Sequence, residues 1–77
     1  MIDAIVAAIA DNYVVVIPTE ESDLNKLIGK KAVYTDSGNR QWNGKVVRLE
    51  DPGVAVEFDN FPTGIGQGQI LEIEDSA

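Results

Sequence analysis

The fold is decided by the stretch GNRQWNGKVVRLEDPGVAVEF, residues 38–58. It begins in a tight turn over 36–39, in which a glycine or an asparagine can take a positive φ. The residues that follow, 41–49, predict a long strand. Gly44 lies inside that strand, where a glycine permits a sharp bend or a bulge. The stretch therefore predicts a strongly bent antiparallel sheet.

Toward the C-terminus, residues 50–53 (Glu-Asp-Pro-Gly) predict a second turn. Residues 54–58 alternate between larger apolar side chains and smaller or charged ones, which predicts a strand with one buried face. The segment 60–68 carries a proline and three glycines, and it is expected to form a loop. Residues 70–74 alternate again and predict the last strand.

Toward the N-terminus, the sequence predicts two helices and two short strands. Apolar residues recur at helical spacing over 2–10, which predicts a short helix. Residues 13–17 are mostly β-branched and predict a strand. Thr19 resembles a helix N-cap, and Gly29 resembles a left-handed residue at a helix end, so a capped helix is expected between them. A further strand is expected over 32–35.

The chain has 77 residues, with no cysteine and no histidine. So short a chain buries only about 60–65% of its unfolded surface, so we expect oligomerisation to support the core. Without thiols and imidazoles there is no thiolate zinc site, no cysteine nucleophile and no common general base at neutral pH. The serines (Ser22, Ser37 and Ser76) lack a histidine partner. We expect no enzyme, no cofactor and no metal.

These elements together predict a mainly β fold in a single domain, 1–77. Its centre is a small barrel of about four or five short, strongly bent strands at 19–75, preceded by a short α-helix. Residues 1–17 are expected to add an N-terminal helix and strand to that barrel.

The charge is negative and unevenly distributed. Thirteen acidic and six basic residues give a net charge of −7, which opposes electrostatic binding of nucleic acid. All six basic residues lie within 26–48, so they either form a local basic face or are solvated singly. The apolar run at 4–10 is too short to span a bilayer and follows an aspartate, so we expect a soluble, cytoplasmic protein with no membrane partner.

A turn glycine, an aromatic residue, a bend glycine and an aliphatic residue follow each other at Gly38, Trp42, Gly44 and Val46. In this order, and together with the glycine-containing segment 66–71, they match the first motif and echo the second motif of the Sm-like family. Residues 23–73 therefore resemble that family, the small barrels of Sm, Lsm and Hfq-type proteins, and the resemblance implies a five-stranded SH3-like barrel. The resemblance implies a homo-oligomeric ring, hexameric or heptameric, whose subunits pair edge to edge. The implied interface residues are Val54, Val56, Phe58, Ile70, Leu71 and Ile73.

The resemblance also implies single-stranded RNA as a partner. The candidate RNA-binding residues are Lys30, Lys31, Arg48, Asp51, Gln67 and Gly68. Gln67 stands where the family has a cation, and no asparagine follows Asp51, so RNA binding is expected to be weak, altered or lost. Three functions stay open: an RNA-binding Sm-like ring, a ring or barrel that is a protein-interaction scaffold, and a monomeric SH3-like adaptor.

Other residues allow a functional and a structural interpretation. Trp42 is either a platform for base stacking or a barrel residue. The glycine-rich segment 64–68 either binds phosphate with its amides or forms a turn. The acidic residues Glu50, Asp51 and Asp59 either bind a hard cation through their carboxylate oxygens or are only solvated. We favour the structural interpretation in each case, and we assign a structural role to Gly29, Gly38, Trp42 and Gly44.

Overall fold

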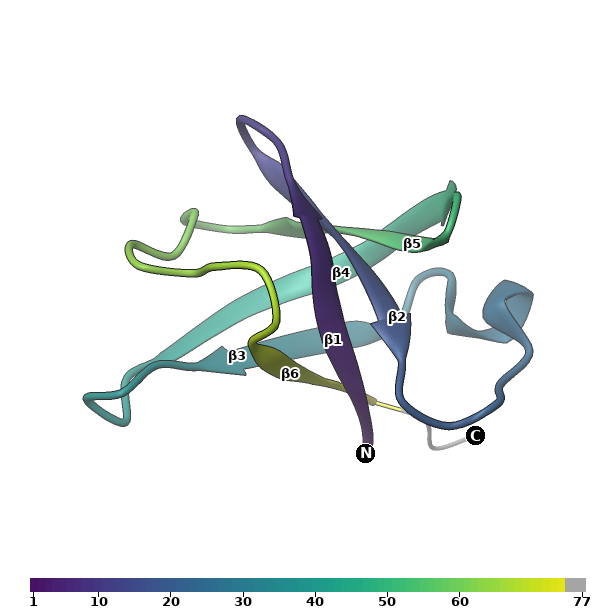
Figure 1. Cartoon of the computed structure of the whole chain (residues 1–77), viewed down its shortest axis with the longest axis horizontal. Helices are drawn as coiled ribbons and strands as arrows, with labels where there is room; N and C mark the ends of the chain where they lie inside the picture. The colour runs from purple at the N-terminus through teal and green to yellow at the C-terminus, as the bar shows by residue number, and fades with distance from the viewer. Residues whose placement is uncertain (75–77) are drawn as a thin grey trace.

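The computed structural model describes residues 1–74, and its strands form one closed, all-antiparallel barrel (Figure 1). Within these residues, six strands and one short 3-10 helix follow each other along the chain. They are β1 (Ile2–Ile9), β2 (Tyr13–Pro18), the 3-10 helix η1 (Leu24–Leu27), β3 (Lys31–Thr35), β4 (Gln41–Glu50), β5 (Gly53–Phe58) and β6 (Ile70–Ile73). Ser76, one of the serines considered above, lies outside the described residues.

The strands run around the barrel in the order β1-β2-β5-β4-β3-β6, and β6 pairs again with β1. Each of the six described strands therefore has a hydrogen-bonded neighbour on both sides. The prediction of five barrel strands with residues 1–17 as an extension was wrong. β1 and β2 are barrel strands, and they close the gap between β5 and β6, whose edges would otherwise be exposed.

The helix predicted for residues 2–10 was wrong, because this segment forms β1. Its side chains alternate, with Ala4 and Val6 buried and Ile5 exposed. The amide of Ala10 donates to the carbonyl of Tyr13 at 2.9 Å, which closes the hairpin to β2. So short a helix is marginal in water, whereas the strand satisfies its backbone against β2 and β6 together.

The second predicted helix, between Thr19 and Gly29, is reduced to η1, and residues 1–74 contain no α-helix. The amide of Thr19 donates to the carbonyl of Asp3 at 2.9 Å, so Thr19 extends the β1–β2 pairing instead of capping a helix. The capping residue is Asp23, whose Oδ1 accepts from the amide of Asn25 at 3.1 Å. The left-handed conformation predicted for Gly29 is confirmed by a φ of 86°.

Aliphatic side chains, most of them alanine and valine, fill the interior of the barrel together with Tyr34. The buried cluster is Ala4, Val6, Val14, Val16, Leu27, Ala32, Tyr34, Val46, Val54, Val56, Leu71 and Ile73. Leu27 reaches this core from η1, so the 3-10 helix contributes to the packing. The alternation predicted for the last strand is confirmed, because Leu71 and Ile73 point inward from β6.

β4 spans both halves of the barrel, since it pairs with β3 at its start and with β5 at its end. Its bulge lies between Val46 and Arg48, beyond the position expected from Gly44. Gly44 has a different role, because a Cβ there would lie 2.6 Å from the carbonyl oxygen of Glu57 and 2.9 Å from a ring carbon of Phe58. β5 therefore approaches β4 too closely at this point for any side chain.

Candidate interaction surface

Three isoleucines lie side by side on the outside of the barrel. Ile5 of β1 pairs directly with Ile17 of β2 and with Ile70 of β6. Cross-strand partners lie on the same face of a sheet with their Cβ atoms about 5 Å apart. The exposed fractions are 40%, 38% and 44% for Ile5, Ile17 and Ile70. We call these three residues the isoleucine row.

Small side chains lie next to this row along the same strands. Ala8 pairs with Val15, beyond a bulge at Ala7. Val15 faces outward but is only 5% exposed, so neighbouring side chains cover most of it. We call Ala7, Ala8 and Val15 the small-residue strip. Residues of one face recur about every 7 Å along a strand, so the strip follows the isoleucine row at about that distance.

Two acidic residues border the isoleucine row on its other side. Asp3 of β1 pairs directly with Glu72 of β6, and both are exposed. Like charges in opposed positions destabilise a sheet. The ion pairs found among residues 1–74 within 4.0 Å do not include these carboxylates. The outer face of β2, β1 and β6 thus has an apolar centre and an acidic border.

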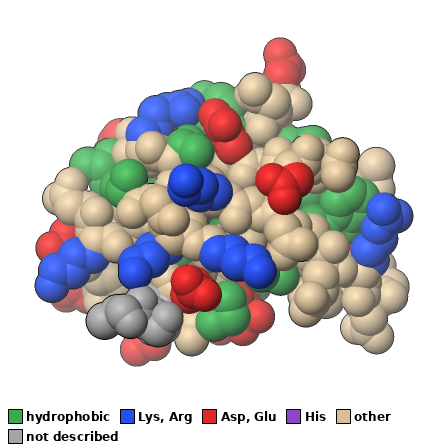
Figure 2. All heavy atoms as spheres, turned by 180° about the vertical axis from the view of Figure 1, so that it is seen from behind, with side chains coloured by type: hydrophobic (Ala, Val, Ile, Leu, Met, Phe, Trp, Pro, Cys, Tyr) green, Lys and Arg blue, Asp and Glu red, His purple; other side chains and the backbone are tan. Residues whose placement is uncertain are grey.

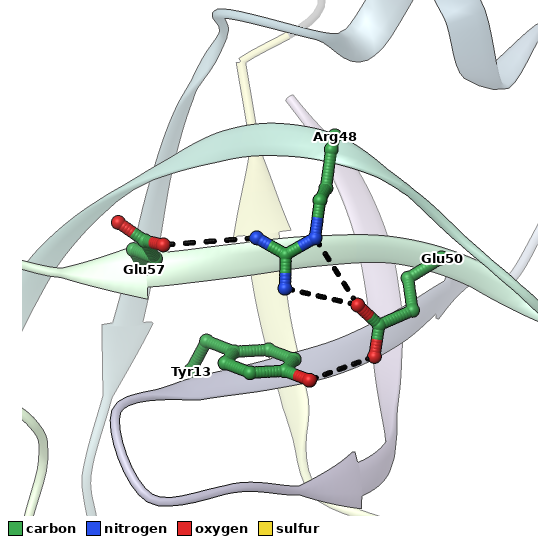
Figure 3. A network of polar contacts seen from close by, with 4 residues as sticks. All are labelled: Tyr13, Arg48, Glu50 and Glu57. Carbon is green, nitrogen blue, oxygen red and sulfur yellow. Dashed lines mark hydrogen bonds and ion pairs between the residues drawn. The ribbon is translucent and has the colours of Figure 1, made fainter.

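A polar network covers the adjoining part of the barrel, across β2, β5 and β4 (Figure 3). The guanidinium of Arg48 donates to Oε1 of Glu50 at 2.9 Å and lies 3.7 Å from Oε2 of Glu57. It also stacks on the ring of Tyr13, 4.7 Å from the centroid. The hydroxyl of Tyr13 donates to Oε2 of Glu50 at 2.9 Å, which closes the network.

This network explains a failed expectation for β5, which was predicted to bury one face only. Ala55 faces outward between Val15 and Arg48, yet it is fully buried. Arg48 crosses β5 to reach Tyr13 and so covers the small side chain of Ala55. The hydrogen bond to Glu50 is the main cause of a further rise in the pKa of Arg48. Arg48 is therefore held by carboxylates of its own chain.

Lys and Arg side chains gather on the face of the molecule seen in Figure 2, with Asp and Glu among them. Lys31 of β3 and Lys45 of β4 are direct cross-strand partners. Lys45 is also opposed by Glu57 on its other side, and the amide of Glu74 donates to the carbonyl of Lys31 at 2.8 Å. A glutamate thus lies next to each of these lysines in the outer surface.

The residues predicted to bind RNA do not converge on one site. Lys31 begins β3 beside Glu74, and Lys30 directly precedes that strand. Gly68 precedes β6 at its other end, where its amide donates to the carbonyl of Val6. About 20 Å of extended chain separates Gly68 from Glu74. Gln67 donates from Nε2 to the carbonyl of Ala7 at 3.0 Å, Asp51 is exposed in the β4–β5 turn, and Arg48 belongs to the network described above.

Most residues predicted for a ring interface lie in the core. Their exposed fractions are at most 1% for Val54, Val56, Leu71 and Ile73. Phe58 is partly buried and packs edge-to-face on Phe61, whereas Ile70 is exposed. Both β5 and β6 are also hydrogen-bonded on both sides within the chain. The ring remains a prediction. Neither the edges of β5 and β6 nor these four side chains are accessible to a neighbouring subunit in this structure.

Trp42 and the turn between β3 and β4 form a compact unit around Asp36. Oδ1 of Asp36 accepts from the amides of Gly38 and Arg40, at 2.9 and 3.0 Å. Oδ2 of Asp36 accepts from Nε1 of Trp42 at 3.1 Å, and the guanidinium of Arg40 covers the indole ring at 4.3 Å. Asn39, with a φ of 63°, takes the positive φ of the turn. These contacts, led by the one to Trp42, lower the pKa of Asp36 below 3.8.

We expect the Asp36→Asn substitution to lower the melting temperature at neutral pH. The pKa of Asp36 is lowered in the folded state, so its ionised form adds stability above 3.8, and this contribution is lost as the pH falls through the folded-state pKa. The difference between the variant and the wild type should therefore shrink in acid. Thermal melts from pH 7 downward measure it, with Glu21→Gln as an exposed control. A constant difference at all pH values would contradict the argument.

The helical spacing over 2–10 hides the isoleucine row. It predicts a helix for the segment that contains Ile5, and a helix would not align this residue with Ile17 and Ile70. The signal that could have revealed the row is the pair Asp11-Asn12 between two apolar runs, which is typical of a hairpin. Of the acids considered for a cation, Glu50 is engaged by Tyr13 and Arg48. Residues 1–74 contain no group of three or more acidic side chains placed to hold a metal ion.

No known protein-family model matches this chain, and no curated protein matches it either. No helix within residues 1–74 is long and apolar enough to cross a membrane. The resemblance to Sm-like proteins therefore rests on the sequence motifs quoted above, and the structure supports the coarser statement of a small, closed, six-stranded antiparallel barrel.

Proposed function

We propose that this chain is a non-enzymatic protein-interaction barrel that binds its partner through the isoleucine row and the small-residue strip. The observation that carries the proposal is the alignment of Ile17, Ile5 and Ile70 in one register on three adjacent strands. Single exposed apolar residues are ordinary, but contiguous ones with a polar border are typical of interaction sites. Here the border is the acidic pair Asp3 and Glu72.

The closed barrel favours binding by side chains. A partner strand needs a free sheet edge for main-chain pairing, and each of the six described strands is already paired twice. The available contact is therefore the outer face itself, where β-branched side chains project from a rigid sheet. This supports the scaffold or adaptor interpretation over one in which subunits extend a common sheet.

The proposal is tested by placing a photo-crosslinking amino acid at position 5, in cells that express the chain. We expect a discrete protein adduct that excess wild-type chain competes away and that Ile17→Asp abolishes. The same probe at Asn43, an exposed residue on the outer side of β4, is the control and should give no such adduct. The proposal fails if position 5 gives no adduct beyond that of the control.

A second candidate is an Sm-like ring that binds single-stranded RNA, and the gathering of Lys and Arg on one face favours it (Figure 2). The glutamates beside Lys31 and Lys45 and the net charge of −7 oppose it. This candidate requires that the chain binds RNA at low salt and that the Lys30→Glu and Lys31→Glu double variant does not. The logarithm of the binding constant should also fall with the logarithm of the salt concentration, with a slope of about −0.7 per phosphate contact. The protein-interaction proposal requires no such affinity.

A further inference from the structure

We infer that the partner of this surface is a segment of another protein in which lysine or arginine stands beside apolar residues. This inference rests on the proposed function and names the chemistry of its partner. It follows from three features of the face on β2, β1 and β6. An apolar pocket continues the isoleucine row, carboxylates border the row and the pocket on one side, and the strands of this face contain no lysine or arginine.

The pocket lies at the β2 end of the isoleucine row and has a volume of about 200 Å³. Ile17 belongs to both the row and the pocket, so the apolar surface continues from Ile5 into the pocket. The other lining residues are Pro18, Glu20, Glu21, Ser22, Leu24 and Pro52. Pockets that hold a whole small molecule measure about 300–1,000 Å³, so this one is sized for a single side chain.

The lining of the pocket suits a lysine or an arginine side chain. Such a side chain packs its aliphatic stem on apolar surface and keeps its charged end at the polar rim. Leu24 and Pro52 provide apolar surface for the stem, and the exposed residues Glu20 and Glu21 provide carboxylates for the charge. An acidic side chain in the same place would meet two like charges.

The acidic border of the isoleucine row continues to this pocket. Asp3 of β1 pairs with Glu72 of β6 on one side. On its other side, the carbonyl of Asp3 accepts from the amide of Thr19 at 2.9 Å, and Glu20 follows directly. The acidic residues thus lie along one side of the apolar surface, from β6 across β1 to the end of β2. The ion pairs found among residues 1–74 within 4.0 Å do not include their carboxylates.

Lysine and arginine are absent from the strands that form this face. All six basic residues lie within 26–48, so β1, β2 and β6 contain none. A basic partner supplies the charge that these strands lack, and complementary charge around an apolar centre favours the correct partner over others. The net charge of −7 acts in the same direction, because it attracts a cationic segment and repels an acidic one.

The first experiment titrates the whole isotope-labelled chain with two peptides of equal length and follows the backbone amides by NMR. One peptide is acetyl-Arg-Leu-Ala-Leu-Arg-amide, and the other has glutamate in place of both arginines. We expect the arginine peptide to shift the resonances of β1, β2, β6 and residues 19–24, and to bind at least about tenfold more tightly than the glutamate peptide. Its affinity should fall at least about threefold between about 0.05 M and about 0.5 M salt, because salt screens the attraction.

Three results of this titration would overturn the inference. The first is equal affinity for the two peptides, and the second is an affinity that salt does not weaken. The third is the absence of shifts on this face at about 5 mM arginine peptide.

Charge-neutralising variants then locate the carboxylates that bind. The double variant Glu20→Gln and Glu21→Gln should weaken binding of the arginine peptide at least about threefold. The matched control is the double variant Asp11→Asn and Asp59→Asn, which changes the net charge by the same amount. Asp11 lies before β2 and Glu20 lies after it, at opposite ends of that strand (Figure 1), and Asp59 follows β5. The control should leave the affinity unchanged, and equal losses in both double variants would overturn the inference.

The photo-crosslinking probe at position 5 separates this inference from the proposed function. Mass spectrometry of the adduct identifies the segment of the partner that lies against the isoleucine row. A segment with lysine or arginine next to apolar residues supports the inference. If the segment is acidic, or belongs to a second copy of this chain, the inference is wrong and the proposed function stands. If the probe gives no adduct beyond that of the control at Asn43, both fail.

Discussion

Gly53→Ala is expected to destabilise the protein by at least about 3 kcal/mol, which lowers the melting temperature by about 15 °C or more. Gly53 opens β5 and is buried against β2. A Cβ at this position would overlap the carbonyl oxygen of Val16 and lie 3.3 Å from the Cα of Ile17. Both neighbours are backbone atoms of a paired strand, so neither can move without breaking the β2–β5 pairing.

The matched control for this substitution is Gly66→Ala. Gly66 lies in the loop before β6, and a Cβ there would meet no heavy atom within 4 Å beyond its own chain neighbours. Its amide donates to Oε1 of Gln69 at 2.8 Å, a bond that alanine retains. We expect a change within about 0.5 kcal/mol for Gly66→Ala. Denaturation of the two variants side by side measures the contrast, and equal stabilities would mean that β2 does not approach Gly53 as described.

The sequence predicted the C-terminal half of the fold better than the N-terminal half. From Lys31 to Ile73, the alternation of side chains and the turn residues are local signals, and the strands form where they predict. Ile2–Ile9 and the segment between Thr19 and Gly29 also carry helical spacing and capping residues. Pairing with two neighbouring strands outweighs those local preferences in β1. Only the three-dimensional closure of the barrel reveals that contribution.

The candidate site was less predictable than the fold, because it depends on register. The isoleucine row joins Ile5, Ile17 and Ile70, which come from three separate segments of the chain. A shift of one residue in either pairing would turn one of these side chains to the interior. Likewise, no local pattern shows that Arg48 crosses β5 to stack on Tyr13 and covers Ala55. The sequence shows that the basic residues cluster over 26–48. It does not show that glutamates from other strands lie beside Lys31 and Lys45.

Ile73→Ala is expected to cost about 2–5 kcal/mol of folding free energy. Ile73 is fully buried and is opposed by Ile2 of β1 on one side and Ala32 of β3 on the other. Truncation leaves a cavity where β6 closes the barrel, and the small Ala32 cannot fill it. A domain of this size has only about 4–12 kcal/mol of net stability, so the variant should be partly unfolded at moderate temperature.

Ile9→Ala is the control, because it removes the same atoms from a residue that is 42% exposed at the end of β1. We expect it to cost less than about 1 kcal/mol, since little apolar surface is lost from the core. Urea denaturation at low protein concentration measures both variants without a contribution from association. If the two substitutions cost the same, Ile73 does not point into the barrel. The register of β6 would then shift by one residue, and Ile70 would no longer stand beside Ile5 in the isoleucine row.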